Sequence, residues 1–200
     1  APSATPSPTL CTEISSAEDI SRLKEEASRK GFLGIALYAV GAEAMVSPLR
    51  AIAFSTAEGT AKFINIPSAK EARSLTMMLL KPLFNCKEYT VVSHDIKRDI
   101  ILLRNAGVTL TAPYFDTRLA HYILQPEMRH RITDIAMNVL GFIPDIEDAE
   151  TARKPYGPLP KGREDQVLCH IADITLRLRA PLVKLLEQNG QLSLLNDIEL

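Results

Sequence analysis

Residues 90–107 read TVVSHDIKRDIILLRNAG, and this stretch decides the fold class. Its apolar first residues predict a short buried strand. A helix follows directly, with Ile96, Ile100 and Leu103 on one face and Gly107 at its end. A strand that passes straight into an amphipathic helix indicates a sheet with helices packed against it.

A first helix is predicted near the start of the chain. Ser16, followed three residues later by Asp19, is a capping-box pattern, and Gly31 supplies a stop. The apolar residues that recur at helical spacing between these signals are Ile20, Leu23 and Ala27. The pattern predicts a helix that begins after Ser16 and ends before Gly31.

Three strands and a second helix are predicted between this helix and residue 90. The run 32–40, FLGIALYAV, is apolar almost throughout, which is typical of a strand buried on both faces. Residues 49–55 and 60–66 predict two more strands, joined by a hairpin turn at 56–59. A helix is expected over 68–83, before the stretch quoted above.

The rest of the chain predicts helices with one irregular connection. Helices are expected over 116–124 and 132–140, and the proline-rich segment 144–163 is expected to be irregular. A last helix starts near Glu164, and Pro181 is expected to kink or break it. Together these elements predict an α/β domain with a mixed sheet flanked by helices.

The composition is that of an ordinary globular protein, with 46% hydrophobic and 24% charged residues. The net charge of −1 gives no reason to expect nucleic acid, so any case for DNA must come from motifs. No stretch approaches the ~18 apolar residues of a membrane span, and no signal peptide is visible. We therefore expect a cytoplasmic, bacterial-type protein without membrane contact.

The three cysteines, Cys11, Cys86 and Cys169, lie at wide and unrelated spacings. An odd number at such spacings argues against a disulfide framework and against a zinc cluster. Reduced thiols are therefore expected.

The start of the chain differs in composition from the rest. Residues 1–10 consist almost entirely of Ala, Pro, Ser and Thr, so residues 1–14 are expected to form an extended linker. One domain is expected over 15–190. Residues 191–200 are expected to begin a connection to a further domain.

The order of these segments resembles the 3′–5′ exonuclease-type domain of bacterial DNA polymerase I, a family A DNA polymerase. In that family a strand leads into an Asn-x-Lys-x-Asp-like helix start, here the helix with Lys97 and Asp99. A Phe-Asp-Thr segment opens the next helix, here FDTRLAHYIL at 115–124. The resemblance implies a ribonuclease H-like fold, with three antiparallel strands first and parallel additions after them.

The resemblance also implies a chemistry. Working members of the family hydrolyse the terminal phosphodiester of a DNA 3′ end with two metal ions, which four carboxylates hold, while a tyrosine helps to position the attacking water. Two divalent cations bring four positive charges into a cleft. A cluster of anionic oxygens is therefore a physical requirement of this site.

Most of the implied metal ligands are missing from this sequence. The Asp-x-Glu of the first strand falls on Ala36 and Tyr38, and the Tyr-x-x-x-Asp of the last helix falls on Val167 and Ile171. Asp99 alone keeps a ligand position. One carboxylate does not balance two divalent cations, so no intact catalytic set and no bound metal or other cofactor are expected.

The leading hypothesis is therefore a non-catalytic scaffold within a DNA polymerase I that takes part in DNA replication and repair. Its expected partners are DNA, bound through the parent polymerase, and the covalently linked 5′-nuclease and polymerase domains. The fragment itself is expected to be monomeric.

Two alternatives remain open. The first is an active exonuclease that uses Mg²⁺ or Mn²⁺, in which Glu43, Glu58 and Asp173 converge on Asp99. The second is a stand-alone binding module related to the exonucleases. Asp99 itself is either a metal contact or a helix-surface carboxylate paired with Lys or Arg.

The remaining polar and sulfur-containing residues have simpler interpretations. Asp116 is expected to cap its helix. Met77 and Met78 are expected in the core. A solvated helix face is expected, rather than a DNA contact, for Lys97, Arg98 and Arg104. Surface or hydrogen-bonded core positions are expected for the four histidines, His94, His121, His130 and His170.

Overall fold

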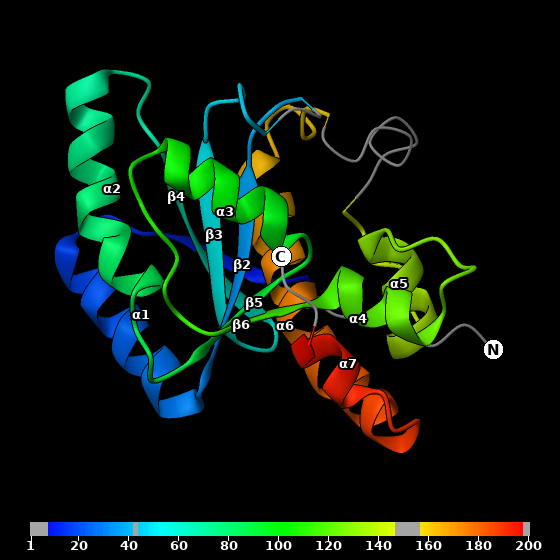
Figure 1. Ribbon diagram of the computed structural model, residues 1–200. Coiled ribbons are helices and arrows are strands. Elements are labelled where there is room, and N and C mark those ends of the chain that lie inside the picture. Colours follow the sequence, from blue (N-terminus) through cyan, green and yellow to red (C-terminus); the bar gives the residue numbers. More distant parts are fainter. Residues whose placement is uncertain (1–7, 42–43, 147–156, 198–200) are drawn as a thin grey trace.

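The structure is a six-stranded sheet between two layers of helices (Figure 1). The computed structural model describes residues 8–41, 44–146 and 157–197. The strands are β1 (Leu10–Glu13), β2 (Phe32–Tyr38), β3 (Ala51–Ala57), β4 (Thr60–Asn65), β5 (Thr90–Ser93) and β6 (Tyr114–Asp116). The helices are α1 (Ala17–Lys30), α2 (Lys70–Phe84), α3 (Ile96–Asn105), α4 (Thr117–Leu124), α5 (Ile132–Leu140), α6 (Glu164–Gln188) and α7 (Leu192–Asp197).

The order of strands in the sheet is β1-β4-β3-β2-β5-β6. β2, β3 and β4 are antiparallel neighbours, and β5 and β6 extend the sheet parallel to β2. The predicted mixed α/β sheet is therefore confirmed, although β1 and β6 were not among the expected strands. Because β2, β5 and β6 are parallel, their carboxyl ends meet at one edge, where ligand sites of α/β sheets are usually found.

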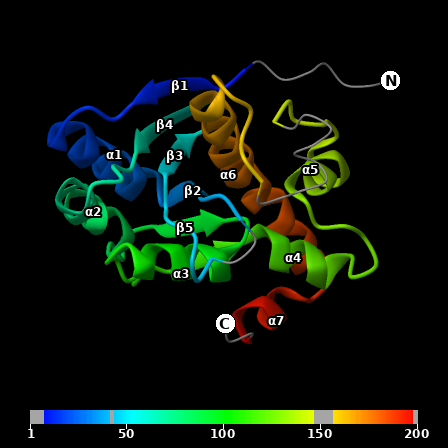
Figure 2. The ribbon, with the colours of Figure 1, turned by 90° about the horizontal axis from the view of Figure 1, so that it is seen from above.

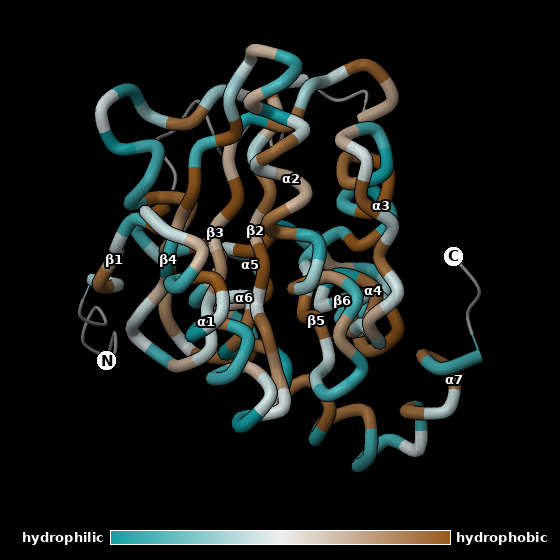
Figure 3. Tube along the Cα trace, turned by 90° about the vertical axis from the view of Figure 1, so that its left-hand side faces the viewer, coloured by the Kyte–Doolittle hydropathy of each residue, from teal (hydrophilic) through white to brown (hydrophobic). Residues whose placement is uncertain are grey.

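The two faces of the sheet carry different helices. Figure 2 shows α1 and α2 on one face and α6 with α5 on the other. Along β2 the side chains alternate, so Leu33, Ile35 and Leu37 enter the core beneath α1 and α2, whereas Ala36 packs with α6. Figure 3 shows this hydrophobic stripe along β2 at the centre of the molecule. Burial on both faces explains why the run is apolar almost throughout.

Helix α1 begins and ends as its sequence signals predict. The Ser16 hydroxyl accepts a hydrogen bond from the Asp19 amide, and the Asp19 carboxylate accepts one from the Ser16 amide, each at 3.2 Å. Gly31 ends the helix in the left-handed conformation with a φ of 86°. The capping box and the glycine stop are therefore confirmed.

Helix α6 is continuous through Pro181, so the expected break is not present. The helix contacts every strand from β1 to β5. Leu178, Leu182 and Leu186 on either side of the proline are fully buried in one hydrophobic cluster. This packing on both sides stabilises the helical path enough to offset the hydrogen bond that proline removes.

Part of the predicted N-terminal linker is a strand. Residues 10–13, within the expected linker 1–14, form β1 and pair in parallel with β4, from Leu10 opposite Thr60 to Glu13 opposite Phe63. A segment with little apolar surface of its own becomes ordered here because β4 offers an edge with unpaired backbone groups.

A disulfide joins Cys11 of β1 to Cys169 of α6, with 5.8 Å between the Cα atoms. The expectation of reduced thiols is therefore wrong for this pair, whereas Cys86 is a free, buried thiol. The partners are 158 positions apart. Only the fold brings them together, so their spacing carried no signal.

A buried carboxylate stabilises the same region. Asp173 of α6 accepts two hydrogen bonds from Arg177 at 2.8 Å, one from Thr9 at 2.6 Å and one from the Gly59 amide at 3.0 Å. Arg177 also pairs with Glu58 at 2.9 Å. This network fastens β1 and the β3–β4 turn to α6.

The expectations for the methionines and histidines are confirmed only in part. Met77 is buried as expected, but Met78 is 67% exposed and lies outside the core. His121 is fully buried and hydrogen-bonded to His130 and Asn138, which confirms a satisfied core histidine. Within the described ranges, no helix is long and apolar enough to cross a membrane.

Candidate functional site

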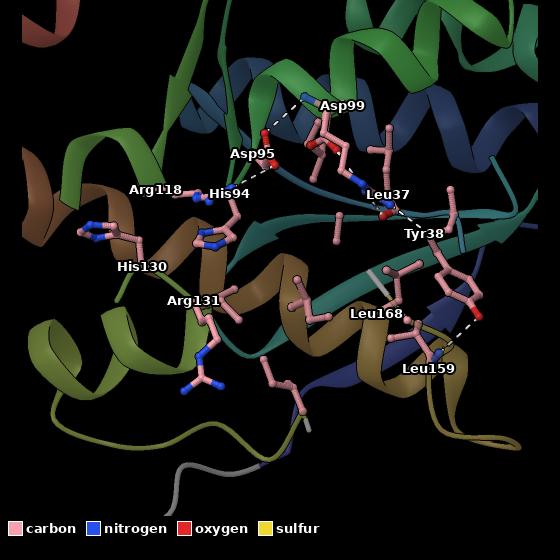
Figure 4. A pocket seen from close by; sticks show the side chains of 18 residues that line it. Leu37, Tyr38, His94, Asp95, Asp99, Arg118, His130, Arg131, Leu159 and Leu168 are labelled. Carbon is pink, nitrogen blue, oxygen red and sulfur yellow. Dashed lines mark hydrogen bonds and ion pairs between the residues drawn. The ribbon is translucent and has the colours of Figure 1, made fainter. Parts of the chain in front are cut away.

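A pocket of about 280 Å³ lies at the carboxyl ends of β2 and β5 (Figure 4). The end of β2 forms one wall, and the starts of α3, α4 and α5 form another. α6 and residues 157 and 159 close the remaining side. The pocket therefore lies at the sheet edge where the carboxyl ends of the parallel strands meet.

Four of the five predicted site residues line this pocket. Ala36 and Tyr38 project from β2, Asp99 from α3 and Ile171 from α6. Val167, one turn before Ile171, is instead buried in a hydrophobic cluster and does not line this pocket. The structure thus brings together the four positions to which the resemblance assigns a metal ligand, but not Val167, to which it assigns the tyrosine.

Tyr38 places a bulky phenol where the resemblance implies a carboxylate. Its hydroxyl accepts a hydrogen bond from the Leu159 amide at 3.3 Å. Figure 4 shows the ring at the wall of the pocket with its hydroxyl directed toward Leu159. The residue therefore anchors the segment before α6 rather than offering an anionic oxygen.

Asp99 is buried, so the expected surface position is wrong, whereas the expected pairing with an arginine is present through Arg98. Its Oδ2 atom accepts a hydrogen bond from the Ser93 hydroxyl at 2.6 Å, and its side chain is 8% exposed. Burial raises the pKa of Asp99 from 3.8 to about 7, against the opposing effects of the Ser93 hydrogen bond and the Arg98 charge. Near neutral pH a substantial fraction of this carboxyl is therefore protonated.

Arg98 is also within the pocket rather than on a solvated face. Its Nη2 atom donates to the Ala39 carbonyl at 3.0 Å and its Nη1 atom to the Leu37 carbonyl at 3.4 Å. Nη1 lies 3.9 Å from Oδ1 of Asp99. The guanidinium therefore connects the end of β2 to the start of α3. Lys97 beside it is exposed, as expected.

Asp116 confirms its predicted role and adds a second one. Its carboxylate accepts from the Leu119 amide at 2.9 Å, which caps α4, and from the Ile96 amide at 2.9 Å, which fastens the start of α3. Burial raises the pKa of Asp116 to about 6, against the lowering effect of these backbone hydrogen bonds. The Phe-Asp-Thr segment thus orients the helix that carries Asp99.

Several pocket residues were not found from the sequence. His94 lies in the wall of the pocket, and its Nδ1 atom is 3.0 Å from the Thr117 hydroxyl. Burial lowers the pKa of His94 to about 4, so its ring is neutral at physiological pH. Arg118 and Arg131 also line the pocket. Only the directions of α4 and α5 bring them there, and no sequence motif marks these directions.

The residues needed by the alternative active site do not meet at Asp99. Glu58 and Asp173 converge on Arg177 beside the β3–β4 turn. The pocket is lined by residues 35–39 at the end of β2, which pair with the first half of β3, whereas the turn follows the last residue of β3. Glu43 lies outside the described residues.

The donor set of the pocket does not fit two divalent metal ions. A catalytic pair of ions lies roughly 3.5–4 Å apart, and each ion needs several oxygen ligands. Of the four predicted ligand positions, Ala36, Tyr38 and Ile171 lack a carboxylate. Among the described residues no group of three or more His, Cys, Asp or Glu side chains has a metal-binding arrangement.

A family model described as 3′-5′ exonuclease matches residues 41–162, more than half of the chain. This chain belongs to the 3′–5′ exonuclease family. The resemblance seen in its segment order is thereby confirmed. A DNA polymerase I of Streptococcus pneumoniae is 33% identical to this exonuclease-family chain over 109 residues, which are 53% of the chain and 12% of that relative. The match thus spans only about an eighth of the curated relative.

Solved structures confirm the fold of this family member. A polymerase domain of Pol1 from M. smegmatis, solved with DNA primer-template and dNTP, matches 94% of this chain and 29% of its own, with a TM-score of 0.72 and 21% identity. NrnC of Brucella melitensis bound to pGG matches 93% of this chain and 86% of its own, with a TM-score of 0.70 and 18% identity. At these identities the likeness is one of fold.

Proposed function

We propose that this chain is a non-catalytic exonuclease-type domain of a DNA polymerase I, which acts as a scaffold between a 5′-nuclease module and a polymerase module. The observation that carries the proposal is the chemistry of the pocket. Ala36, Tyr38 and Ile171 line the same pocket as Asp99, and the resemblance assigns a metal-binding carboxylate to each of their positions.

The charge of the pocket supports this proposal. Among the described residues, the lining carries three guanidinium groups, from Arg98, Arg118 and Arg131, and two carboxyl groups, from Asp95 and Asp99. Arg118 pairs with Asp95 at 3.3 Å. Two catalytic ions bring four positive charges and need an anionic lining. A lining with this balance repels them, because unit charges about 4 Å apart interact by roughly 4 kcal/mol at an effective dielectric constant of 20.

The scaffold role is supported by what the fold retains. The sheet, the capping of α3 by Asp95, the capping of α4 by Asp116 and the long helix α6 are all intact. Loss of ligands with retention of the packed frame is the pattern expected when a domain keeps a spatial role. The proposed partners, DNA and the linked modules, follow from the similarity to DNA polymerase I and to a polymerase structure that contains DNA.

The proposal is tested by incubating the protein with 5′-labelled single-stranded DNA in Mg²⁺, in Mn²⁺ and in EDTA. We expect no shortening from the 3′ end beyond that in EDTA, since each missing catalytic group costs ~10²–10⁴ in rate. Shortening that requires metal and disappears in Asp99→Ala would overturn the proposal and favour an active exonuclease with rearranged ligands. Arg22→Ala, on the exposed surface of α1, controls for contaminating nuclease and for the effect of preparation.

A further inference from the structure

The guanidinium of Arg98 lies where three oxygen atoms of the pocket corner meet. Two are the carbonyl oxygens of Leu37 and Ala39, at the end of β2, and the third is Oδ1 of Asp99. The Arg98 side chain is 12% exposed, so little water screens its charge.

Carbonyl and carboxylate oxygens are also the ligands that a hard divalent cation prefers. At this corner, Arg98 forms an ion pair with Oδ1 of Asp99, and the Ser93 hydroxyl donates a hydrogen bond to Oδ2. The planar guanidinium presents five N–H donors in a fixed geometry, and it is always charged. The guanidinium therefore interacts with the oxygen atoms that a metal ion would otherwise coordinate.

We infer that the guanidinium of Arg98 takes the place of a divalent ion beside Asp99. Its fixed positive charge opposes the binding of such ions in the pocket. The inference rests on the proposed function and deepens it. It separates two obstacles to metal binding: the missing carboxylates at positions 36, 38 and 171, and a fixed positive charge at position 98. Restoring carboxylates therefore does not restore metal affinity while Arg98 is in place.

The test compares Mn²⁺ affinities, measured from the electron paramagnetic resonance signal of free Mn²⁺, in variants of the 200-residue protein. Ala36→Asp adds one carboxylate to the wall that faces Asp99. We expect Mn²⁺ to bind about tenfold or more tightly when Arg98→Met is added to Ala36→Asp, because a fixed unit charge near 4 Å is removed. Equal affinities of the single and the double variant, within about twofold, overturn the inference.

Lys97→Met is the matched control, since Lys97 immediately precedes Arg98 in α3, carries the same charge and is exposed. Added to Ala36→Asp, it is expected to change Mn²⁺ affinity less than about twofold, because water and salt screen an exposed charge. Arg98→Lys keeps the charge and is expected to keep affinity low. If Arg98→Lys and Arg98→Met increase affinity equally, geometry rather than charge is responsible and the inference is wrong.

A second measurement avoids the new buried carboxylate, in case Ala36→Asp does not fold. Wild type and Arg98→Met are titrated with Mn²⁺, and paramagnetic broadening of the Ser93 and Ile171 amide resonances is followed. Stronger broadening in Arg98→Met supports the inference, and unchanged broadening contradicts it. Failure of the proposed function has a different signature, namely metal-dependent DNA shortening by the wild-type protein.

Discussion

Gly34 of β2 lies directly beneath Leu176 of α6. A Cβ atom at position 34 would come within 2.8 Å of the Leu176 Cβ atom and 2.9 Å of the Ala172 carbonyl oxygen. Neither atom moves when a side chain changes rotamer, so the contact cannot be relieved locally. The absence of a side chain at Gly34 therefore sets the distance between α6 and the sheet.

Gly34→Ala is expected to destabilise the protein by about 1–3 kcal/mol, because the added methyl group must push α6 away from β2. Urea unfolding measures this change. Thr12→Ala, on exposed β1, is the control and is expected to change the free energy of unfolding by less than about 0.5 kcal/mol. An unchanged midpoint in Gly34→Ala would contradict the close packing.

The buried carboxyl of Asp99 makes stability depend on pH. Its pKa is raised from 3.8 to about 7 on folding, so the folded state binds the proton more tightly than the unfolded state. This contribution is fully present below pH 4 and is lost as pH rises through 7. The difference in pKa corresponds to at most roughly 4 kcal/mol.

Asp99→Asn removes the titration and keeps the shape. Relative to wild type, this variant is expected to gain stability between pH 5 and pH 8, by about 1–3 kcal/mol after allowance for the stabilising contacts from Arg98 and Ser93. Urea unfolding at the two pH values measures the gain. A difference between variant and wild type that is the same at both pH values would show that Asp99 titrates normally.

The Cys11–Cys169 disulfide predicts a thiol count and a response to reductant. The unfolded, unreduced protein should show one reactive thiol, from Cys86. Reduction is expected to lower the free energy of unfolding by about 2–5 kcal/mol, since the bridge closes a long loop in the unfolded chain. Cys11→Ser combined with Cys169→Ser should lose the response to reductant, and three reactive thiols in wild type would disprove the bridge.

Removing the arginine of the buried Asp173–Arg177 pair is expected to lower stability much more than removing the arginine of an exposed pair. Arg177→Met leaves a fully buried carboxylate without its bidentate partner and is expected to cost about 3–5 kcal/mol. Arg22→Met breaks an exposed pair with Glu18 and is expected to cost less than about 0.5 kcal/mol. Thermal unfolding of both variants checks the contrast, and similar costs would place Asp173 in contact with water.

The sequence predicted those parts of the fold whose signals are local. The capping box at Ser16, the stop at Gly31 and the apolar run of β2 each depend on a few neighbouring residues, and each is confirmed. β1 was missed because it becomes a strand only by pairing with β4, about 50 positions further along the chain. The prediction of a kink or break at Pro181 was wrong for the same reason, because packing against distant residues stabilises α6 on both sides of the proline.

The site shows the same division. Ala36, Tyr38 and Asp99 could be placed at the pocket because the family resemblance assigns metal-ligand positions to them, at the end of β2 and in α3. The role of Arg98 could not, since its spacing is compatible with a solvated face and only its side-chain direction brings it to β2. The resemblance assigns the tyrosine position to Val167, one turn before Ile171, but the direction of its side chain in α6 places it in the core and not in the pocket.

The hydrogen bond between Tyr38 and Leu159 limits which residues position 38 can accommodate. Replacing the phenol by an acidic side chain would release the segment before α6 at the same moment as it introduced a negative charge beside apolar neighbours. An acidic residue at position 38 is therefore expected to lower the stability of the fold for two separate reasons, the lost contact with Leu159 and the partly buried charge.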